Sequence, residues 1–125
     1  MRYYSEDHVW LHVCDRVATL GVSRHAAAEL GELTFVELPT PGTRFAHGDV
    51  LCVVESVKTA ADVCCPVGGT VSAVNRLLHD HPSLVNSSPE ADGWVCRLAD
   101  IVPADIPGLL TAEQYEAFLA KQAQR

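Results

Sequence analysis

The sequence predicts a small, mainly β domain with short helices, and three features of the chain carry this prediction. Most segments alternate apolar and polar residues with the period of two that is typical of half-buried strands. These segments are rich in Val, Thr and Leu and are separated by turn residues such as Pro41-Gly42 and Gly68-Gly69. The chain has 125 residues, of which 48% are hydrophobic, which is enough for one core. We therefore expect a single domain, residues 1–125, built as a small β-sandwich or barrel.

Seven segments carry the strand pattern. They are Trp10–Val13, Val17–Val22, Thr34–Glu37, Val50–Glu55, Ala61–Cys65, Thr70–Val74 and Trp94–Leu98. A run of small residues over Arg24–Leu30 lies between Ser23, a favourable N-cap, and Gly31, a favourable residue just after a helix. This arrangement predicts a short helix after the second strand.

The C-terminal end predicts a further helix, at about residues 111–121. Thr111 and Gln114 fit a capping box, in which each side chain accepts a hydrogen bond from the backbone N–H of the other residue. Tyr115, Phe118 and Leu119 recur at the spacing of one helical face. A helix this short depends on tertiary packing, so we expect this apolar stripe to pack on the domain.

The charge pattern argues against several classes of partner. The formal net charge is −7, and the nine basic residues are scattered along the chain, so no basic stripe is present to bind phosphates. No apolar run approaches the ~20 residues that span a bilayer, and the N-terminus MRYYSEDH lacks the features of a signal or transit peptide. We therefore expect neither nucleic acid nor a membrane as a partner.

The five cysteines favour a reducing compartment. Their number is odd, and most lie in apolar strand segments where a thiol behaves as a small hydrophobe. A metal site formed by Cys64, Cys65, His79 and His81 is the weaker interpretation. Adjacent strand residues point to opposite faces, so one ion could not easily bind both thiolates. We expect no metal site.

Lys58 is the residue that the strand pattern explains least. The predicted strands leave residues 56–60 as a connection, which places Lys58 at or near the tip of a hairpin. The chain contains seven arginines but only two lysines, and the lysine amine, unlike guanidinium, can be acylated. An exposed amine is a poor catalyst unless burial or nearby charge activates it. The pattern therefore favours a covalent attachment point, with a solvated turn lysine as the alternative.

Six motifs give the chain its resemblance to a known family. They are His8-Val9-Trp10, LGELTFVELPTPG over residues 30–42, VESVK over 54–58, DVCCPVGGTVSAVN over 62–75, LVNSSPEADGW over 84–94, and the closing LLTAEQYEAF. Taken together, from Tyr4 to Phe118, they resemble the glycine cleavage system H-protein, the lipoyl carrier of that complex. The resemblance implies a hammerhead-like β fold, the barrel-sandwich hybrid of lipoyl domains, with short flanking helices and a C-terminal helix.

The same resemblance implies the chemistry. Lipoate would be attached to Lys58, and Glu55 would help the lipoylating enzyme to select that lysine. The arm would take an aminomethyl group from glycine at a glycine decarboxylase that uses pyridoxal phosphate, and present it to a tetrahydrofolate-dependent aminomethyltransferase. A flavoprotein, dihydrolipoyl dehydrogenase, would reoxidise the arm. The chain would be a monomeric carrier and not an enzyme, in the bacterial cytoplasm or in the mitochondrial matrix.

The resemblance also implies a cleft in which the loaded arm is protected from water, and the chain departs from the family there. Members usually carry a glutamate where this chain has Val9. We expect Asp62 and Asp7 to supply carboxylates to the cationic end of the arm, with His25 close to it. The alternative is that Val9 faces the core and that the glutamate is dispensable.

Other carriers fit the motifs less well. A biotin carrier shares the fold plan, but its lysine is flanked by methionines, whereas Lys58 lies between Val57 and Thr59. The lipoyl domains of 2-oxo acid dehydrogenases prefer an acidic residue directly before the lysine. A plain interaction module without a cofactor, and an H-like protein that relays lipoyl groups to other complexes, are the remaining alternatives.

Overall fold

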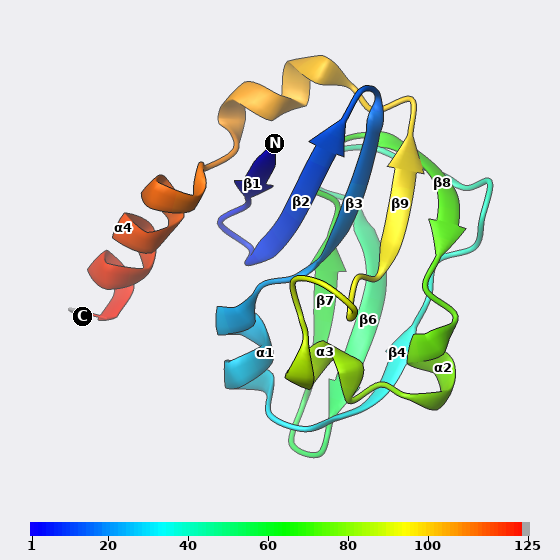
Figure 1. Cartoon of the computed structure of the whole chain (residues 1–125), viewed down its shortest axis with the longest axis vertical. Coiled ribbons are helices and arrows are strands. Elements are labelled where there is room, and N and C mark those ends of the chain that lie inside the picture. Colours follow the sequence, from blue (N-terminus) through cyan, green and yellow to red (C-terminus); the bar gives the residue numbers. More distant parts are fainter. Residues whose placement is uncertain (124–125) are drawn as a thin grey trace.

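Two antiparallel sheets lie against each other in the computed structural model, which describes residues 1–123 (Figure 1). The larger sheet has the strand order β1-β2-β3-β9-β8-β5, and the smaller sheet has the order β4-β6-β7. The strands of the larger sheet are β1 Arg2–Tyr4, β2 Val9–Cys14, β3 Val17–Val22, β5 Arg44–Phe45, β8 Gly69–Val74 and β9 Cys96–Ala99. Those of the smaller sheet are β4 Leu33–Glu37, β6 Val50–Ser56 and β7 Ala60–Cys64. This architecture confirms the mainly β prediction.

Short helices flank the sheets. They are α1 Arg24–Leu30, α2 Leu77–Asp80, α3 Leu84–Ser87, a 3₁₀ helix over Pro103–Gly108, and α4 Ala112–Ala123. In Figure 1, α4 stands beside β1 at the edge of the larger sheet, whereas α1, α2 and α3 lie together at the lower end of the molecule. The β6–β7 hairpin projects from this same end.

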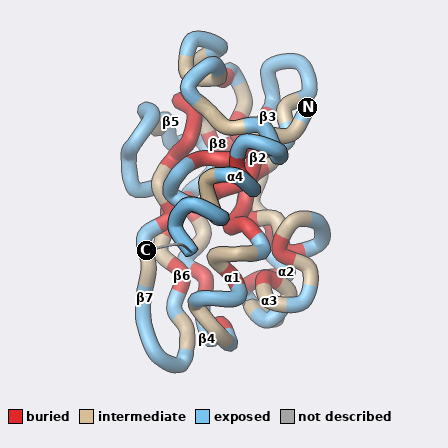
Figure 2. Tube along the Cα trace, turned by 90° about the vertical axis from the view of Figure 1, so that its left-hand side faces the viewer, coloured by how far each residue is buried: buried red, intermediate tan, exposed pale blue. Residues whose placement is uncertain are grey.

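The core lies between the two sheets. Leu11 and Leu20 of the larger sheet and Val54 and Val63 of the smaller sheet are all at most 2% exposed and belong to one cluster. Burying side chains of this size stabilises the fold by roughly 1.5–3 kcal/mol each. Figure 2 shows the buried segments gathered in the middle of the molecule and the β6–β7 hairpin tip exposed below them. The core therefore fixes the stem of the hairpin and leaves its tip open to solvent.

Three of the five cysteines belong to this core. Burial raises the pKa of Cys52 to about 12 and that of Cys65 to about 11, and it also raises the pKa of the buried Cys96. These thiols are packing residues. Within residues 1–123, no group of three or more His, Cys, Asp or Glu side chains is placed to hold a metal ion. Over the same residues, no helix has the length and apolar character needed to cross a membrane.

Local capping explains where α1 begins and ends. The Ser23 side chain accepts a hydrogen bond from the backbone N–H of Ala26 at 3.2 Å. Gly31 follows the helix with φ at +78°, in the left-handed region that favours glycine. Both residues have the roles that the sequence predicts.

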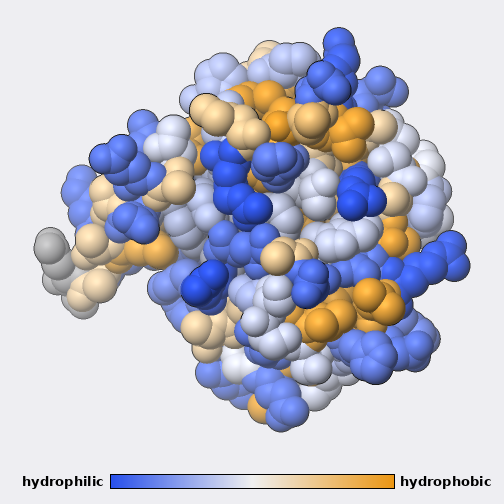
Figure 3. All heavy atoms as spheres, in the orientation of Figure 1, coloured by the Kyte–Doolittle hydropathy of each residue, from blue (hydrophilic) through white to orange (hydrophobic). Residues whose placement is uncertain are grey.

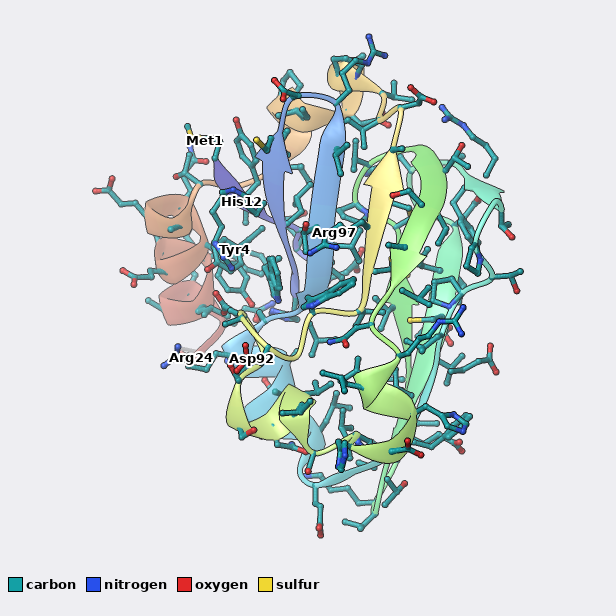
Figure 4. The ribbon with its side chains drawn as sticks, turned by 45° about the vertical axis from the view of Figure 1, so that its right-hand side comes forward. Met1, Tyr4, His12, Arg24, Asp92 and Arg97 are labelled. Atoms are coloured by element: carbon teal, nitrogen blue, oxygen red, sulfur yellow. The ribbon has the colours of Figure 1, made fainter. Side chains whose placement is uncertain are left out.

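The capping box of α4 is also confirmed. The Thr111 N–H donates to Gln114 Oε1 at 3.0 Å, and the Gln114 N–H donates to Thr111 Oγ1 at 3.2 Å. The apolar stripe packs on the domain through Tyr115, whose ring stacks on that of Tyr4 with centroids 4.4 Å apart. Figure 4 shows Tyr4 on the side of the sheet that faces α4.

Two strands were not predicted, and the bounds of most predicted strands differ by one or two residues from those observed. The strands β1 and β5 were not predicted, because segments of three and two residues are too short to show a period. Tertiary pairing creates them, as in the alignment of β1 with β2. The predicted strand at Trp94 begins two residues later, at Cys96, although the Val95 N–H already donates to Leu20 O at 2.8 Å.

A few large apolar side chains remain exposed, among them Phe35 at 42% and Val57 at 68%. The face drawn in Figure 3 is largely hydrophilic and carries separate hydrophobic patches instead of one continuous apolar surface. Scattered apolar residues are normal on a protein surface. Val57, however, lies in the hairpin tip next to Lys58, where no core contact explains it.

Candidate functional site

Lys58 lies at the tip of the β6–β7 hairpin and is exposed, as the spacing predicts. Glu55 and Ala60 are the last paired residues, so the chain turns between them. The Ser56 N–H donates to Thr59 O at 2.7 Å, and Ser56 Oγ accepts from the backbone N–H groups of Lys58 and Thr59 at 3.3 and 3.2 Å. The backbone of the turn is thereby ordered, and the lysine amine stays accessible to a partner enzyme.

Glu55 belongs to the hairpin but not to the cleft beside it. Its neighbour Val54 is 1% exposed and faces the core, so alternation directs the exposed Glu55 to the other face of the smaller sheet. There it lies in register with the exposed Phe35 of β4. This position, three residues before Lys58, is open to an enzyme that acts on the lysine.

A cavity of about 190 Å³ lies beside the hairpin stem, where α1 meets β7; we refer to it as the β7–α1 cleft. Its apolar lining residues are Val9, Val22, Ala26, Leu30, Val54, Ala61 and Val63. Its polar lining residues are Asp7, His8, His25, Glu29 and Asp62. The structure therefore brings together Asp7, His25 and Asp62, the three residues expected near the arm, although they come from the turn before β2, from α1 and from β7.

The cleft contains more carboxylates than cations. His25 Nε2 contacts the carboxylate of Glu29, one helical turn further along α1, and the two form an ion pair when the imidazole is protonated. The His8 ring lies 4.9 Å from the His25 ring, and burial, together with the charge of His25, lowers the pKa of His8. The carboxylates of Asp7, Glu29 and Asp62 thus line the cleft beside two imidazole rings, and that of His8 is held towards its neutral form. The cleft is therefore suited to a cationic group.

Glu29 and His8 also line the cleft and were not predicted from the sequence. Glu29 had a readable signal, because its i,i+4 spacing from His25 places both side chains on one face of α1. His8 had none, since its position depends on a backbone φ of +67° and on contacts from distant elements. Its Nδ1 lies 2.7 Å from the hydroxyl oxygen of Tyr115 on α4, and the same oxygen lies 2.8 Å from Ser23 Oγ.

Val9 combines the two roles that the sequence left open. It is 1% exposed and belongs to the main core, and its side chain also forms part of the wall of the β7–α1 cleft. Its backbone N–H donates to Ser5 Oγ at 3.1 Å. A longer acidic side chain at this position would thus begin in the core and point its carboxylate towards the cleft.

The cleft is within reach of a group attached to Lys58. Asp62 follows Lys58 by four residues, which at a strand rise of ~3.3 Å per residue corresponds to about 13 Å. A lysine side chain extended by a short acyl chain reaches about 10–15 Å by ordinary bond lengths. The attached group can therefore lie along the hairpin stem with its end at the cleft.

Comparisons with known proteins identify the family. A family model described as glycine cleavage H-protein matches residues 2–122. A glycine cleavage system H protein of Phenylobacterium zucineum is 43% identical and covers 94% of this chain and 97% of its own length, and one of Thermotoga maritima is 36% identical and covers 98% of both. A relative from Schizosaccharomyces pombe, named as a mitochondrial glycine cleavage system H protein, is 42% identical over 97% of this chain and 72% of its own length.

A solved structure gives the same result. The crystal structure of a glycine cleavage system H protein from Mycobacterium marinum superposes with a TM-score of 0.85 at 29% sequence identity, and the match covers 95% of this chain and 96% of that one. The chain therefore belongs to the glycine cleavage H-protein family, the lipoate-bearing carriers of the glycine cleavage system, and it acts there as a carrier and not as an enzyme.

Proposed function

We propose that Lys58 is the lipoylated residue of this carrier and that residues 1–125 act as one lipoyl-carrier domain. The observation that carries the proposal is an exposed, acylatable amine on an ordered hairpin turn. A cleft that suits a cation lies within reach of it. These residues fit an attached lipoyl group, because the tip leaves the amine accessible and the stem offers an apolar surface along which the arm can lie.

The lipoyl group, when bound, supplies the disulfide that accepts the aminomethyl group of glycine. The side chains of this protein hold and orient that cargo. An aminomethyl group is an amine and is protonated at neutral pH, and a cation in a partly dry cleft is costly without a carboxylate partner. Asp7, Glu29 and Asp62 supply such partners, and the apolar lining of the cleft limits access of water.

The carrier acts with the enzymes of the glycine cleavage system. Its proposed partners are the pyridoxal-phosphate glycine decarboxylase, the tetrahydrofolate-dependent aminomethyltransferase, dihydrolipoyl dehydrogenase and a lipoylating enzyme. Tethering raises the concentration of the arm at each docked active site without any new contact. The net charge of −7 steers the carrier towards basic docking faces, so association should weaken as salt rises.

The compartment follows from the source of the chain. Named relatives come from bacteria and from a mitochondrial protein of fission yeast. We propose the cytoplasm for a bacterial source and the mitochondrial matrix for a eukaryotic one, both of which are consistent with five unpaired cysteines.

The attachment site is tested by intact mass of protein made in a lipoate-competent host. The wild type should carry a lipoyl adduct and support glycine cleavage, whereas Lys58→Arg should fold normally, carry no adduct and support no reaction. Lys121→Arg, in the exposed last turn of α4, is the matched control and should behave as the wild type. A biotinyl adduct, or lipoate on Lys58→Arg, would refute the proposal.

A further inference from the structure

The hairpin tip is fastened to the loop between α1 and β4. The Val57 N–H donates to Glu32 O at 3.1 Å, which is a contact between the tip and another element. The Lys58 side chain lies over Gly31, the residue before Glu32. Its Cε is 3.5 Å from the position that a Cβ atom would occupy on Gly31. The Val57 side chain is 68% exposed and gives the tip no anchor in the core. The position of the tip therefore depends on the position of residues 31 and 32.

One side chain fixes this loop from the other side. Asn86 lies on α3, and its Nδ2 donates to Gly31 O at 2.7 Å. Its Oδ1 accepts from the Leu33 N–H at 2.9 Å. Both ends of a single amide thus hold the backbone on either side of Glu32, whose carbonyl binds the tip.

We infer that Asn86 is a positioning residue for the acylation of Lys58, acting through the loop at residues 31–32; this inference rests on the proposed attachment at Lys58. The amide keeps Glu32 O where it receives the Val57 N–H, and the tip is thereby held in the form that the lipoylating enzyme binds. Without the amide, the tip occupies other arrangements for part of the time. An enzyme that binds one arrangement then shows a weaker apparent affinity in proportion to the lost population.

The reaction itself is the transfer of a lipoyl group to the amine. With a lipoate–protein ligase, lipoate and ATP first give lipoyl adenylate and pyrophosphate. The Lys58 amine then attacks the acyl carbon, an amide bond forms, AMP leaves and the amine loses a proton. Asn86 touches none of the reacting atoms, so its removal should raise KM for the carrier and leave kcat nearly unchanged.

The matched control is Asn75, which is buried, whereas Asn86 is half-buried. Asn75 is 4% exposed, and its Nδ2 donates to Asp92 O at 2.9 Å and to Trp94 O at 2.8 Å, in the connection between α3 and β9 where Figure 4 labels Asp92. Replacement of either asparagine by aspartate keeps the shape, adds one negative charge and removes the amide donor. Asn75→Asp loses two donated bonds and Asn86→Asp loses one, so the control should be destabilised at least as much.

The experiment measures initial rates of lipoylation against the concentration of apo-carrier, at a temperature where circular dichroism shows every variant folded. We expect KM of Asn86→Asp to rise about fivefold or more, the factor for one ordinary hydrogen bond, with kcat within about twofold. Asn75→Asp should stay within about twofold of the wild type in both constants. Amide hydrogen exchange at Val57 should be faster in Asn86→Asp than in Asn75→Asp.

The outcomes separate this inference from the proposed function. If the wild type gains no lipoyl group on Lys58, the attachment proposal fails. Suppose that the wild type is lipoylated. The positioning role of Asn86 is then overturned if Asn86→Asp and Asn75→Asp have the same KM, or if the rise in KM of each variant simply follows its fall in melting temperature. Unchanged exchange at Val57 in Asn86→Asp would overturn it as well.

Discussion

Removal of a carboxylate from the β7–α1 cleft should shorten the lifetime of the aminomethyl cargo. Asp62 and Glu29 line the cleft and are exposed when no arm covers them. Two unit charges 4 Å apart attract by about 1 kcal/mol in water and about 4 kcal/mol at an effective dielectric constant near 20. Because both carboxylates are exposed, we take the lower value, which corresponds to about fivefold in the ratio of protected to unprotected arm.

The assay loads the lipoylated carrier with the aminomethyl group, separates it from the decarboxylase, and follows ammonia release in the absence of the aminomethyltransferase. Asp62→Asn and Glu29→Gln should each shorten the lifetime by up to about fivefold, and the double variant should shorten it further. Added salt should shorten the lifetime of the wild type and have less effect on the double variant. Asp80→Asn makes the same Asp-to-Asn change on α2, outside the cleft. It is the control and should leave the cargo lifetime unchanged.

Two results would refute this reasoning. An unchanged lifetime in the double variant would mean that carboxylates do not protect the cargo. An equal loss in Asp80→Asn would mean that overall charge, and not the cleft, is responsible. Separation of the loaded carrier before the measurement keeps a defect in loading from being read as a defect in protection.

Two further predictions concern single substitutions. Glu55→Ala should lower the fraction of the protein that carries lipoate, as measured by intact mass. Its melting temperature should stay nearly unchanged, because Glu55 is exposed on the outer face of the hairpin. A large fall in melting temperature with normal lipoylation would make Glu55 a structural residue. Val9→Glu should destabilise the empty carrier at pH 7 by roughly 1–3 kcal/mol in chemical denaturation, because Val9 is 1% exposed. Burial raises the pKa of such a carboxyl, so the cost of its ionisation is fully present above the raised pKa, shrinks as pH falls from there towards about 4.3, and is lost below that pH. The cargo lifetime should be unchanged or longer.

Capping rules and the strand period predicted the elements that are defined by residues close together in the sequence. Ser23 and Gly31 bound α1 as expected, and the capping box at Thr111 starts α4. The strand pattern located the hairpin, although its stem alternates only in part between core and solvent, because the register shifts between Val50 and Cys52. Strands such as β1 and β5 carry no such signal, since pairing with a long neighbour creates them.

The candidate site was predictable only in part for the same reason. Asp62 was expected beside the arm from the family resemblance, and the structure places it on the hairpin stem, four residues after Lys58. The counterion Glu29 needed only the helical spacing from His25 to be found. The role of Asn86 could not be predicted, because its two hydrogen bonds span 53 and 55 residues of sequence and depend on how α3 packs against the loop after α1.

A carrier of this kind must confine its arm and yet release the cargo, which requires an ordered hairpin tip and a cleft that binds the cargo only weakly. A tether delivers cargo efficiently when the arm explores a small volume, and loss of order at the tip would enlarge that volume and lower the effective concentration at a docked partner. The turn bonds of Ser56 and the bond from Val57 to Glu32 confine the motion to the arm itself. In the proposed function the cleft competes with each partner for the same arm, so it must release the cargo readily. Exposed carboxylates that contribute about 1 kcal/mol each meet this need, because a fully buried ion pair would hold the cargo against transfer.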